Sequence, residues 1–329
     1  MARVVRFHQH GGPEVLRIET VDVPPPASGE VQIGVRALGL NRAEALLRKG
    51  TYIETATFPS GLGLEAAGVV EAVGDDVTSF VPGDAVSIVP PLSMVRWPAY
   101  AELATFPAEL VVKHPPELGF EAAAAMWMQY LTAYGALVDI AGLVRGDVVA
   151  ITAASSSVGL AAIQIANRIG AVPVALTRTS IKRRPLLDAG AAHVVVSDEE
   201  PIGAQLLEIA GSKGVRVIFD AVGGPAFEPL TAAMSSGGIL IEYGGLSSEP
   251  TPFPHFNVLG KSLTLRGYLV HEIIRDPARL AKAKAFILDG LSDRTLMPVI
   301  ARTFRFDEIV EAHRFLESNT QFGKIVVTI

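Results

Sequence analysis

A run of small residues between an apolar strand and an apolar helix is the strongest chemical signal in the sequence. The run follows Val148–Thr152 and contains Ser155, Ser156, Ser157 and Val158. Small residues let backbone N–H groups approach a pyrophosphate, and a helix N-terminus favours anions. The usual dinucleotide fingerprint has three glycines, and those positions here read Ala154, Ser156 and Gly159. An ordinary strand–helix turn capped by serines is therefore the alternative.

Cations rather than acids follow the next predicted strand. The residues at and beyond its end are Thr177, Arg178, Lys182, Arg183 and Arg184. NAD enzymes place a carboxylate at such a position to bind the ribose diol, and none is present here. Arginine and lysine bind phosphate well, so the pattern favours NADP(H) over NAD(H). A solvated basic helix end is the alternative.

Composition excludes several other kinds of chemistry. The 329 residues include no cysteine, which rules out disulfides, thiolate zinc sites and cysteine nucleophiles. With Lys+Arg 28 and Asp+Glu 34, the net charge of −6 disfavours nucleic-acid binding. The seven histidines show no ligand-like spacing, so we expect no metal site. Residues 1–12 lack the apolar segment of a secretory signal, and we expect a cytoplasmic protein.

Short apolar runs between Gly- and Pro-rich turns predict an irregular β-barrel or sandwich in the first ~120 residues. The runs are Arg3–Phe7, Glu30–Ala37, Ala67–Val73, Ala85–Val89 and Ala99–Leu103. Asn41–Arg48 is predicted to form a short helix among these strands.

A different pattern begins at Glu121, where strands and helices alternate after a long predicted helix, Glu121–Ile140. The predicted strands are Val148–Thr152, Val172–Leu176, His193–Val196, Val215–Asp220 and Gly238–Tyr243. The predicted helices are Ser157–Ile169, Ser180–Ala189, Ile202–Ala210 and Pro225–Met234. Such alternation predicts a parallel sheet covered on both faces. The tail adds strands at Leu263–Leu269 and Gly323–Thr328, and helices at Asp276–Leu288 and Asp307–Ser318.

Two uncharged stretches, Val148–Ala166 and Ala122–Val138, approach the length of a membrane span. Polar residues interrupt both, and buried α/β segments are commonly this apolar, so we expect no membrane association.

A series of short motifs is typical of a known protein family. They are Gly39–Glu44, Gly50–Tyr52, Gly63–Val70, Tyr100–Glu102, Thr132–Tyr134, Gly146–Val148, Asp220–Gly224, Tyr243–Gly245 and Phe322–Ile325. In this order the chain resembles the zinc-independent quinone oxidoreductase (zeta-crystallin-like) branch of the medium-chain dehydrogenase/reductase superfamily. The resemblance covers essentially the whole length. It implies an α/β protein with a GroES-like β-barrel catalytic domain, residues 1–122 and 265–329, and a doubly wound Rossmann NADP(H)-binding domain, residues 123–264.

The resemblance also implies what is missing. Zinc-dependent relatives have a cysteine about where Leu40 or Asn41 stands and a histidine where this chain has Leu64, before Glu65. Zinc-dependent alcohol oxidation is therefore not expected. Glu44 replaces the usual aspartate of its motif, and we assign it no chemical role.

Site residues follow from the same resemblance. Asn41 and Thr132 are expected near the nicotinamide, where a left-handed turn residue and a helix-packing residue are the respective alternatives. The remaining residues expected to flank the dinucleotide are Val222, Gly244, Gly245 and Leu246. Tyr52 is the favoured proton donor to the oxyanion left by hydride transfer, with a pocket wall as its alternative.

The expected activity is zinc-free, NADPH-dependent reduction of quinones or α,β-unsaturated carbonyls. An enoyl thioester reductase and a non-catalytic NADPH-binding protein remain alternatives. The apolar loop Pro90–Pro98, with Met94, Arg96 and Trp97, is a candidate lid over a small, planar, apolar substrate, unless Trp97 simply packs on the barrel. An apolar edge strand at Leu263–Leu269 predicts a homodimer.

Overall fold

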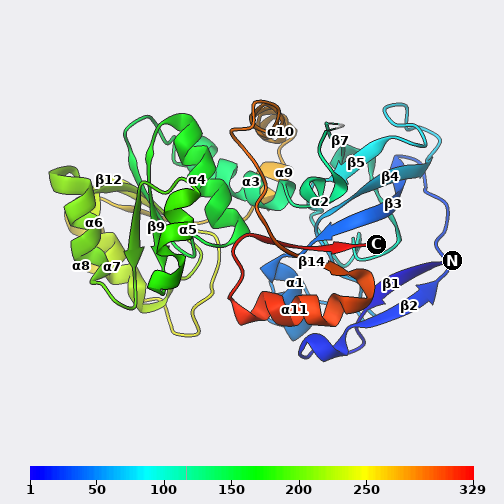
Figure 1. The fold of residues 1–329 in the computed structure, drawn as a ribbon, viewed down its shortest axis with the longest axis horizontal. Helices are drawn as coiled ribbons and strands as arrows, with labels where there is room; N and C mark the ends of the chain where they lie inside the picture. The colour runs from blue at the N-terminus through cyan, green and yellow to red at the C-terminus, as the bar shows by residue number, and fades with distance from the viewer. Residues whose placement is uncertain (116) are drawn as a thin grey trace. The chain divides into compact units, whose positions relative to one another are not determined.

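A computed structural model describes residues 1–115 and 117–329 (Figure 1). The chain forms two compact units, Met1–Met128 with Pro298–Ile329, and Gln129–Met297. These divisions differ from the predicted ones, which assigned residues 265–297 to the catalytic domain. The difference arises because strand β13 (Thr264–Gly267) pairs with the parallel sheet of the second unit, and Arg279 beyond it bonds to Asp139 at 2.5 Å.

The second unit is built on a six-stranded parallel sheet in the order β10-β9-β8-β11-β12-β13. Its other strands are β8 (Val148–Ile151), β9 (Val172–Thr177), β10 (His193–Val196), β11 (Val215–Asp220) and β12 (Met234–Glu242). Its helices are α4 (Ser157–Ile169), α5 (Arg183–Asp188), α6 (Ile202–Ala210), α7 (Phe227–Ala232), α8 (His255–Lys261), α9 (His271–Ile274) and α10 (Pro277–Ser292). In chain order the strands read 3-2-1-4-5-6, the doubly wound arrangement whose direction reverses between β8 and β11. The predicted Rossmann sheet is therefore confirmed.

Helix α4 shows why the local prediction there was accurate. The Ser156 side chain accepts a hydrogen bond from the Gly159 N–H at 3.0 Å, which caps the helix start. Gly170 ends the helix with φ 86°, a conformation that costs glycine little. The helix packs its apolar face inward, so Val148–Ala166 is a strand, a turn and a helix rather than a span. In the part of the chain that the structure describes, no helix is long and apolar enough to cross a bilayer.

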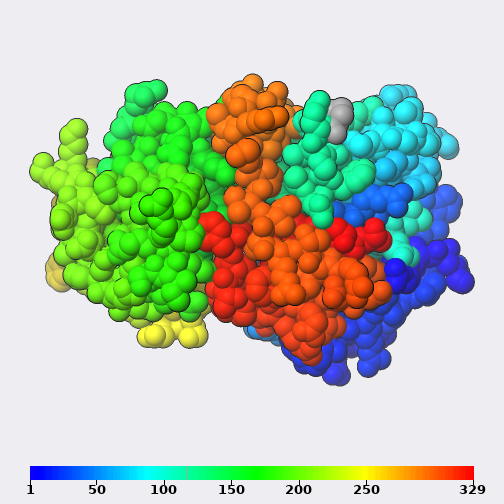
Figure 2. All heavy atoms as spheres, viewed as in Figure 1, coloured from blue at the N-terminus to red at the C-terminus, as the bar shows by residue number. Residues whose placement is uncertain are grey.

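The first unit contains a seven-stranded sheet in the order β14-β15-β3-β4-β5-β7, with β6 paired to β3, and a separate β1–β2 pair. The strands are β1 (Ala2–Arg6), β2 (Arg17–Val21), β3 (Glu30–Gly39), β4 (Ala66–Val73), β5 (Ala85–Ile88), β6 (Leu103–Pro107), β7 (Val111–Lys113), β14 (Ile300–Arg305) and β15 (Lys324–Thr328). The helices are α1 (Arg42–Lys49), α2 (Phe120–Ala123) and α11 (Ile309–Ser318), and α3 (Trp127–Tyr134) crosses into the second unit. The last residues, red in Figure 2, belong to the first unit because β15 pairs with β3.

Two predicted elements of this region are wrong. Ala99–Leu103 is not a strand, because Ala101 forms only an isolated bridge with Val4 and β6 begins at Leu103. The single helix predicted over Glu121–Ile140 is broken into α2, α3 and a π-helical turn at Gly135–Ile140.

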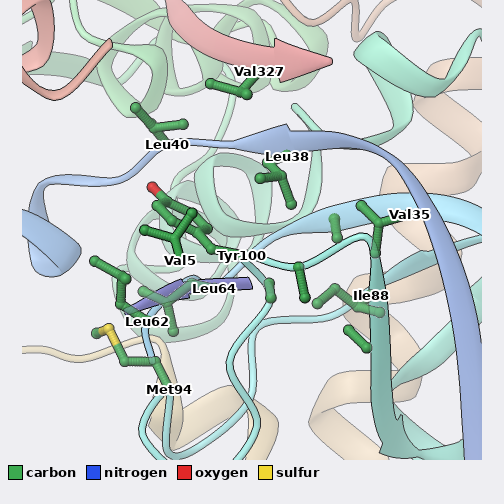
Figure 3. Packing of buried hydrophobic residues seen from close by; sticks show 14 of the residues in the cluster. Val5, Val35, Leu38, Leu40, Leu62, Leu64, Ile88, Met94, Tyr100 and Val327 are labelled. Atoms are coloured by element: carbon green, nitrogen blue, oxygen red, sulfur yellow. The ribbon is translucent and has the colours of Figure 1, made fainter. Parts of the chain in front are cut away.

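The interior of the first unit is largely apolar, with polar side chains among the apolar ones. Leu62, Leu64 and Met94 are at most 1% exposed and pack in the same cluster as Val5 (Figure 3). Tyr100 lies among them, also 1% exposed, with its hydroxyl oxygen inside the core. A buried hydroxyl needs a hydrogen-bond partner, and the partner of this one is the Glu44 carboxylate.

Candidate functional site

The turn after β8 has the close packing that a dinucleotide fold requires. A Cβ atom added at Gly159 would lie 2.6 Å from the Cα of Ala154, so only glycine fits at this crossing of helix and strand. Ala153 has φ 45°, a left-handed conformation that a side chain adopts only with strain. The serine-rich turn therefore has the third glycine of the fingerprint in its packing role, although the first two glycines are absent.

Two of the predicted phosphate-binding residues meet at this turn. The Lys182 ammonium donates to the Ser155 hydroxyl at 2.9 Å. Burial lowers the pKa of Lys182, and the positive charge of Arg178 lowers it further. Arg178 is exposed just beyond the end of β9, directly after Thr177. A cation whose charge is destabilised by a neighbouring cation gains when an anion binds between them.

The other two cations of this cluster are paired elsewhere. Arg183 forms an ion pair with Glu200 and donates to the Val194 carbonyl at 2.9 Å. Arg184 pairs with Asp188 one helical turn away, at 2.9 Å. Of the four cations that the sequence groups together, Lys182 thus contacts the serine turn and lies near enough to Arg178 to feel its charge, whereas Arg183 and Arg184 are paired with carboxylates.

The loops after β11 and β12 are joined beside this turn. Asp220 is fully buried and accepts hydrogen bonds from Thr152 at 2.6 Å and from the Val222 N–H at 2.9 Å. The Leu246 N–H donates to the Ala221 carbonyl at 3.1 Å. Because β8 and β11 are the neighbours at the switch point, these bonds bring the loops to the edge where doubly wound sheets bind ligands.

The two glycines of the β12 loop differ in their surroundings. A Cβ at Gly244 would lie 2.9 Å from the Ala221 carbonyl oxygen, whereas one at Gly245 would meet nothing within 4 Å. Leu246 is 46% exposed. The structure therefore places Gly244 and Leu246 against Ala221, which precedes Val222, and the role of these loops in flanking a ligand stays a prediction.

Asn41 begins α1 in the first unit as its N-cap residue. It has φ −131°, so the left-handed alternative for this residue is wrong. Its backbone N–H donates to Glu44 at 2.7 Å, and its amide nitrogen donates to the Gly39 carbonyl at 3.0 Å. Its amide oxygen accepts from Lys324 at 2.6 Å. The side chain is thus held by bonds at both ends within its own unit.

Lys324 and Glu65 form an ion pair in which each side chain is 1% exposed. Glu65 also accepts from the Met128 N–H at 2.9 Å and from the Asn41 amide at 3.3 Å. Sequence reasoning used Lys324 only as part of a motif and missed this role. The available signal was a lysine at the start of β15, directly before the apolar residues Ile325–Val327. Among the described residues, no group of three or more His, Asp or Glu side chains has a metal-binding arrangement.

Tyr52 lies in the loop after α1 and is half-buried. Burial raises its pKa to about 12, and the negative charges of Glu54 and Glu44 contribute to the rise. The phenol is therefore protonated at neutral pH and can donate a hydrogen bond or a proton.

The neighbouring loop, residues 90–98, is anchored rather than free. Glu54 accepts hydrogen bonds from the Ser93 hydroxyl and, at 3.1 Å, from the Met94 N–H. Met94 belongs to the core, and the Arg96 guanidinium lies 4.4 Å from the centroid of the Trp97 ring. Of the three residues proposed for a lid, Met94 is thus fixed in the interior.

Thr132 is buried on α3, in the second unit, whereas Asn41 and Tyr52 belong to the first. The predicted site residues therefore form two groups, a nucleotide-type edge in the second unit and a polar cluster in the first.

Comparisons with known proteins match both units. Residues 27–116 match the alcohol dehydrogenase GroES-like domain, and residues 157–287 match the zinc-binding dehydrogenase family. The quinone oxidoreductase of Lama guanicoe is 31% identical over 100% of this chain and 98% of its own length. This chain belongs to the quinone oxidoreductase branch of the medium-chain dehydrogenase/reductase superfamily.

Solved structures of the superfamily have the same fold. Escherichia coli quinone oxidoreductase, solved in complex with NADPH, has a TM-score of 0.91 and 29% identity, with full coverage of both chains. A structure described as an NAD-dependent alcohol dehydrogenase has a TM-score of 0.89 and 31% identity, covering 99% of each chain. The fold is shared by members with different cofactors and substrates, so those two properties depend on the side chains at the site.

Proposed function

We propose that this chain is an NADPH-dependent reductase of quinones or α,β-unsaturated carbonyls. The observation that carries the cofactor assignment is the Lys182–Ser155 contact beside exposed Arg178, in place of a ribose-binding carboxylate. The E. coli quinone oxidoreductase, with the same fold, was solved with NADPH, which supports the assignment. Two cations next to a helix N-terminus fit the 2′-phosphate and the pyrophosphate of that cofactor.

Each predicted residue has a role in this proposal. Backbone N–H groups of the serine turn hold the pyrophosphate, and the loops after β11 and β12 flank the dinucleotide. The residues concerned are Ser155, Ser156, Ser157, Val158, Thr177, Arg178, Lys182, Val222, Gly244, Gly245 and Leu246. Asn41 and Thr132 border the nicotinamide, in keeping with the family. Bound NADPH supplies the hydride, and the chain supplies position and a proton donor.

The two pairs of cations provide a matched test of cofactor choice. In the R178A/K182A double variant, we expect NADPH to bind about 10- to 100-fold more weakly, since hydrogen bonds to charged groups contribute ~1.5–3 kcal/mol. NADH binding should change little. The R183A/R184A variant removes the same charge but leaves the serine turn intact, and it should bind NADPH nearly as the parent does. Dissociation constants from nucleotide fluorescence report both results. Equal losses in the two double variants would contradict the assignment.

Tyr52 is the proposed proton donor to the oxygen that becomes negative when hydride reaches a conjugated carbonyl. Its pKa, raised to about 12, keeps the phenol protonated at neutral pH. Tyr52→Phe should therefore slow enone reduction, while quinone reduction, which can take its protons from water, should be less affected. If Tyr52→Phe turned over the enone and the quinone each as fast as the parent does, the acid role would be excluded.

The substrate class is tested with three acceptors at saturating NADPH. Faster NADPH oxidation with 9,10-phenanthrenequinone or a 2-enone than with a crotonyl thioester would support the proposal. The reverse order would indicate an enoyl thioester reductase. Tight NADPH binding without turnover of any acceptor would indicate a binding protein.

A homodimer is the proposed assembly, because β13 forms an edge of the six-stranded sheet. Thr264 and Gly267 are exposed there, and Leu265 is partly exposed. Unpaired strand edges favour pairing with another strand. Light scattering at working concentration should give twice the chain mass, and a monomer mass would contradict the dimer. A cytoplasmic location likewise stays a prediction.

A further inference from the structure

A deeply buried titratable cluster of the first unit lies beside the Asn41 loop. Glu44 on α1 and His313 on α11 are 0% exposed, and Tyr100 between them is 1% exposed. The Tyr100 hydroxyl oxygen is 2.5 Å from a Glu44 carboxylate oxygen and 3.3 Å from His313 Nε2. One hydroxyl thus lies within reach of a carboxylate and of an imidazole, and it can donate to only one of them at a time.

Glu44 braces two backbone segments through its carboxylate. One oxygen accepts from the Asn41 N–H at 2.7 Å, and the other accepts from the Leu64 N–H at 2.9 Å. Each of these partners is a donor, and so is Tyr100, which suits the ionised carboxylate. A proton added to Glu44 would need an acceptor, and the Tyr100 oxygen becomes one if its own hydrogen turns toward His313.

The rotation of the Tyr100 hydroxyl toward His313 requires a neutral imidazole that carries its proton on Nδ1, so that Nε2 is the acceptor. Burial lowers the pKa of His313 to about 3, and the charges of Arg48 and Arg42 act in the same direction. A neutral imidazole has one nitrogen that accepts, and Nε2 is the nitrogen that faces Tyr100.

We propose that Glu44 is a positioning residue for the Asn41 loop, and that Tyr100 and His313 form a hydrogen-bonded switch that lets Glu44 take up one proton without releasing this loop. The proton comes from water and forms one O–H bond on Glu44. The only other change is the rotation of the Tyr100 hydroxyl from Glu44 to His313. The switch rests on the proposed function only in so far as Asn41 borders the nicotinamide.

Several charged and titratable groups act on this cluster from the elements packed around it. They are Arg42 and Arg48 of α1, Tyr52 of the following loop, Glu65 before β4, Tyr100, His313 of α11 and Lys324 of β15. Burial raises the pKa of Glu44 to about 7, against the hydrogen bonds from Tyr100 and Asn41 and the charge of Lys324. Proton uptake therefore falls in the neutral range, where the switch has a use.

Infrared titration of the protein without substrate tests the switch directly. The spectrum of the wild-type protein should contain a protonated-carboxyl band that disappears near neutral pH and is missing from Glu44→Gln. That variant also separates Glu44 from Glu242, whose pKa is raised by burial. A titration that is identical in wild type and in Glu44→Gln would overturn the proposal.

The two partners of the switch should move the midpoint in opposite directions. Tyr100→Phe removes the donor to the ionised carboxylate and also the acceptor of the protonated one. Because a hydrogen bond to a charged group is the stronger of the two, the midpoint should still rise, by about one pH unit at most. His313→Leu removes the acceptor needed by the protonated form, so the midpoint should fall by a similar amount. His313→Gln, which restores an acceptor, should recover it. Tyr130→Phe removes a buried hydroxyl of the second unit and should leave the midpoint unchanged.

If the midpoint of the Glu44 titration moved in the same direction in Tyr100→Phe and in His313→Leu, the switch would be refuted. If Tyr100→Phe does not fold, His313→Leu and His313→Gln are sufficient: the midpoint should fall in the first variant and recover in the second. The NADPH dissociation constant shows whether Glu44 still holds the Asn41 loop. It should stay constant as the pH passes through the wild-type midpoint, and it would change if proton uptake freed the loop. Because the infrared result needs neither cofactor nor turnover, it stands apart from any failure of the proposed reductase activity.

Discussion

The polar groups of the two units are used in different ways. In the first unit, Asn41, Glu65 and Lys324 bond to one another in a closed, buried set. At the edge of the second unit, Lys182 is only partly buried and Arg178 is exposed. The comparison separates residues that build a scaffold from residues that remain accessible to a ligand, although all of them appeared as site residues or motif members in the sequence.

Lys324→Met tests the closed set and should have the largest effect. It leaves the Glu65 carboxylate buried without its cation, which is expected to lower the free energy of unfolding by about 3–5 kcal/mol. Urea denaturation measures the change. The E65Q/K324M double variant removes both charges and should be more stable than Lys324→Met alone. A single variant within about 1 kcal/mol of wild type would show that the pair behaves like a surface ion pair.

The pH dependence of stability sharpens the same comparison, because the buried cluster of Glu44, Tyr100 and His313 in the first unit contains two titrating groups whose pKa shifts have opposite signs. Glu44 has its folded pKa raised from 4.5 to about 7, so the native state holds an extra proton in that window and loses stability as pH rises. His313 has its folded pKa lowered from 6.5 to about 3, so the native state gains stability as pH rises from 3 to 6.5. Between about pH 4.5 and 6.5 the two contributions oppose each other.

Single variants should expose each slope. In Glu44→Gln the histidine acts alone, and unfolding free energy should rise between pH 4.5 and 6.5 by up to about 2–3 kcal/mol relative to wild type. In His313→Gln the relative slope should have the opposite sign. Urea denaturation across this range measures both, and equal slopes in the two variants would contradict the assignment of the pKa shifts.

Local signals explain which parts of the structure were predictable. Helix α4 was predicted with its observed bounds because Ser156 and Gly170 mark its ends within the same short segment. The Glu65–Lys324 pair joins residues that are 259 positions apart, and the local sequence around either residue does not indicate its partner. The same holds for Arg183, whose pairing with Glu200 becomes visible only once α5 lies beside β10. Strand–helix alternation and capping predicted the parallel sheet and the serine turn, whereas the division of cations into ligand-facing and structural ones required the fold.

Two adjacent serines provide the smallest and most specific test of the comparison. Ser156 caps α4, and Ser155 accepts from Lys182. Ser156→Ala should lower the free energy of unfolding by about 1 kcal/mol through loss of the cap. Ser155→Ala should stay within about 0.5 kcal/mol of wild type in stability, as expected for a position that serves the ligand rather than the fold. It should nevertheless weaken NADPH binding, because Lys182 loses the hydroxyl that orients it. Thermal denaturation and nucleotide fluorescence on both variants separate the two roles. If Ser155→Ala were the more destabilising of the two, the serine turn would belong to the scaffold, and the contrast between a closed first unit and an accessible second one would fail at the place where it matters most.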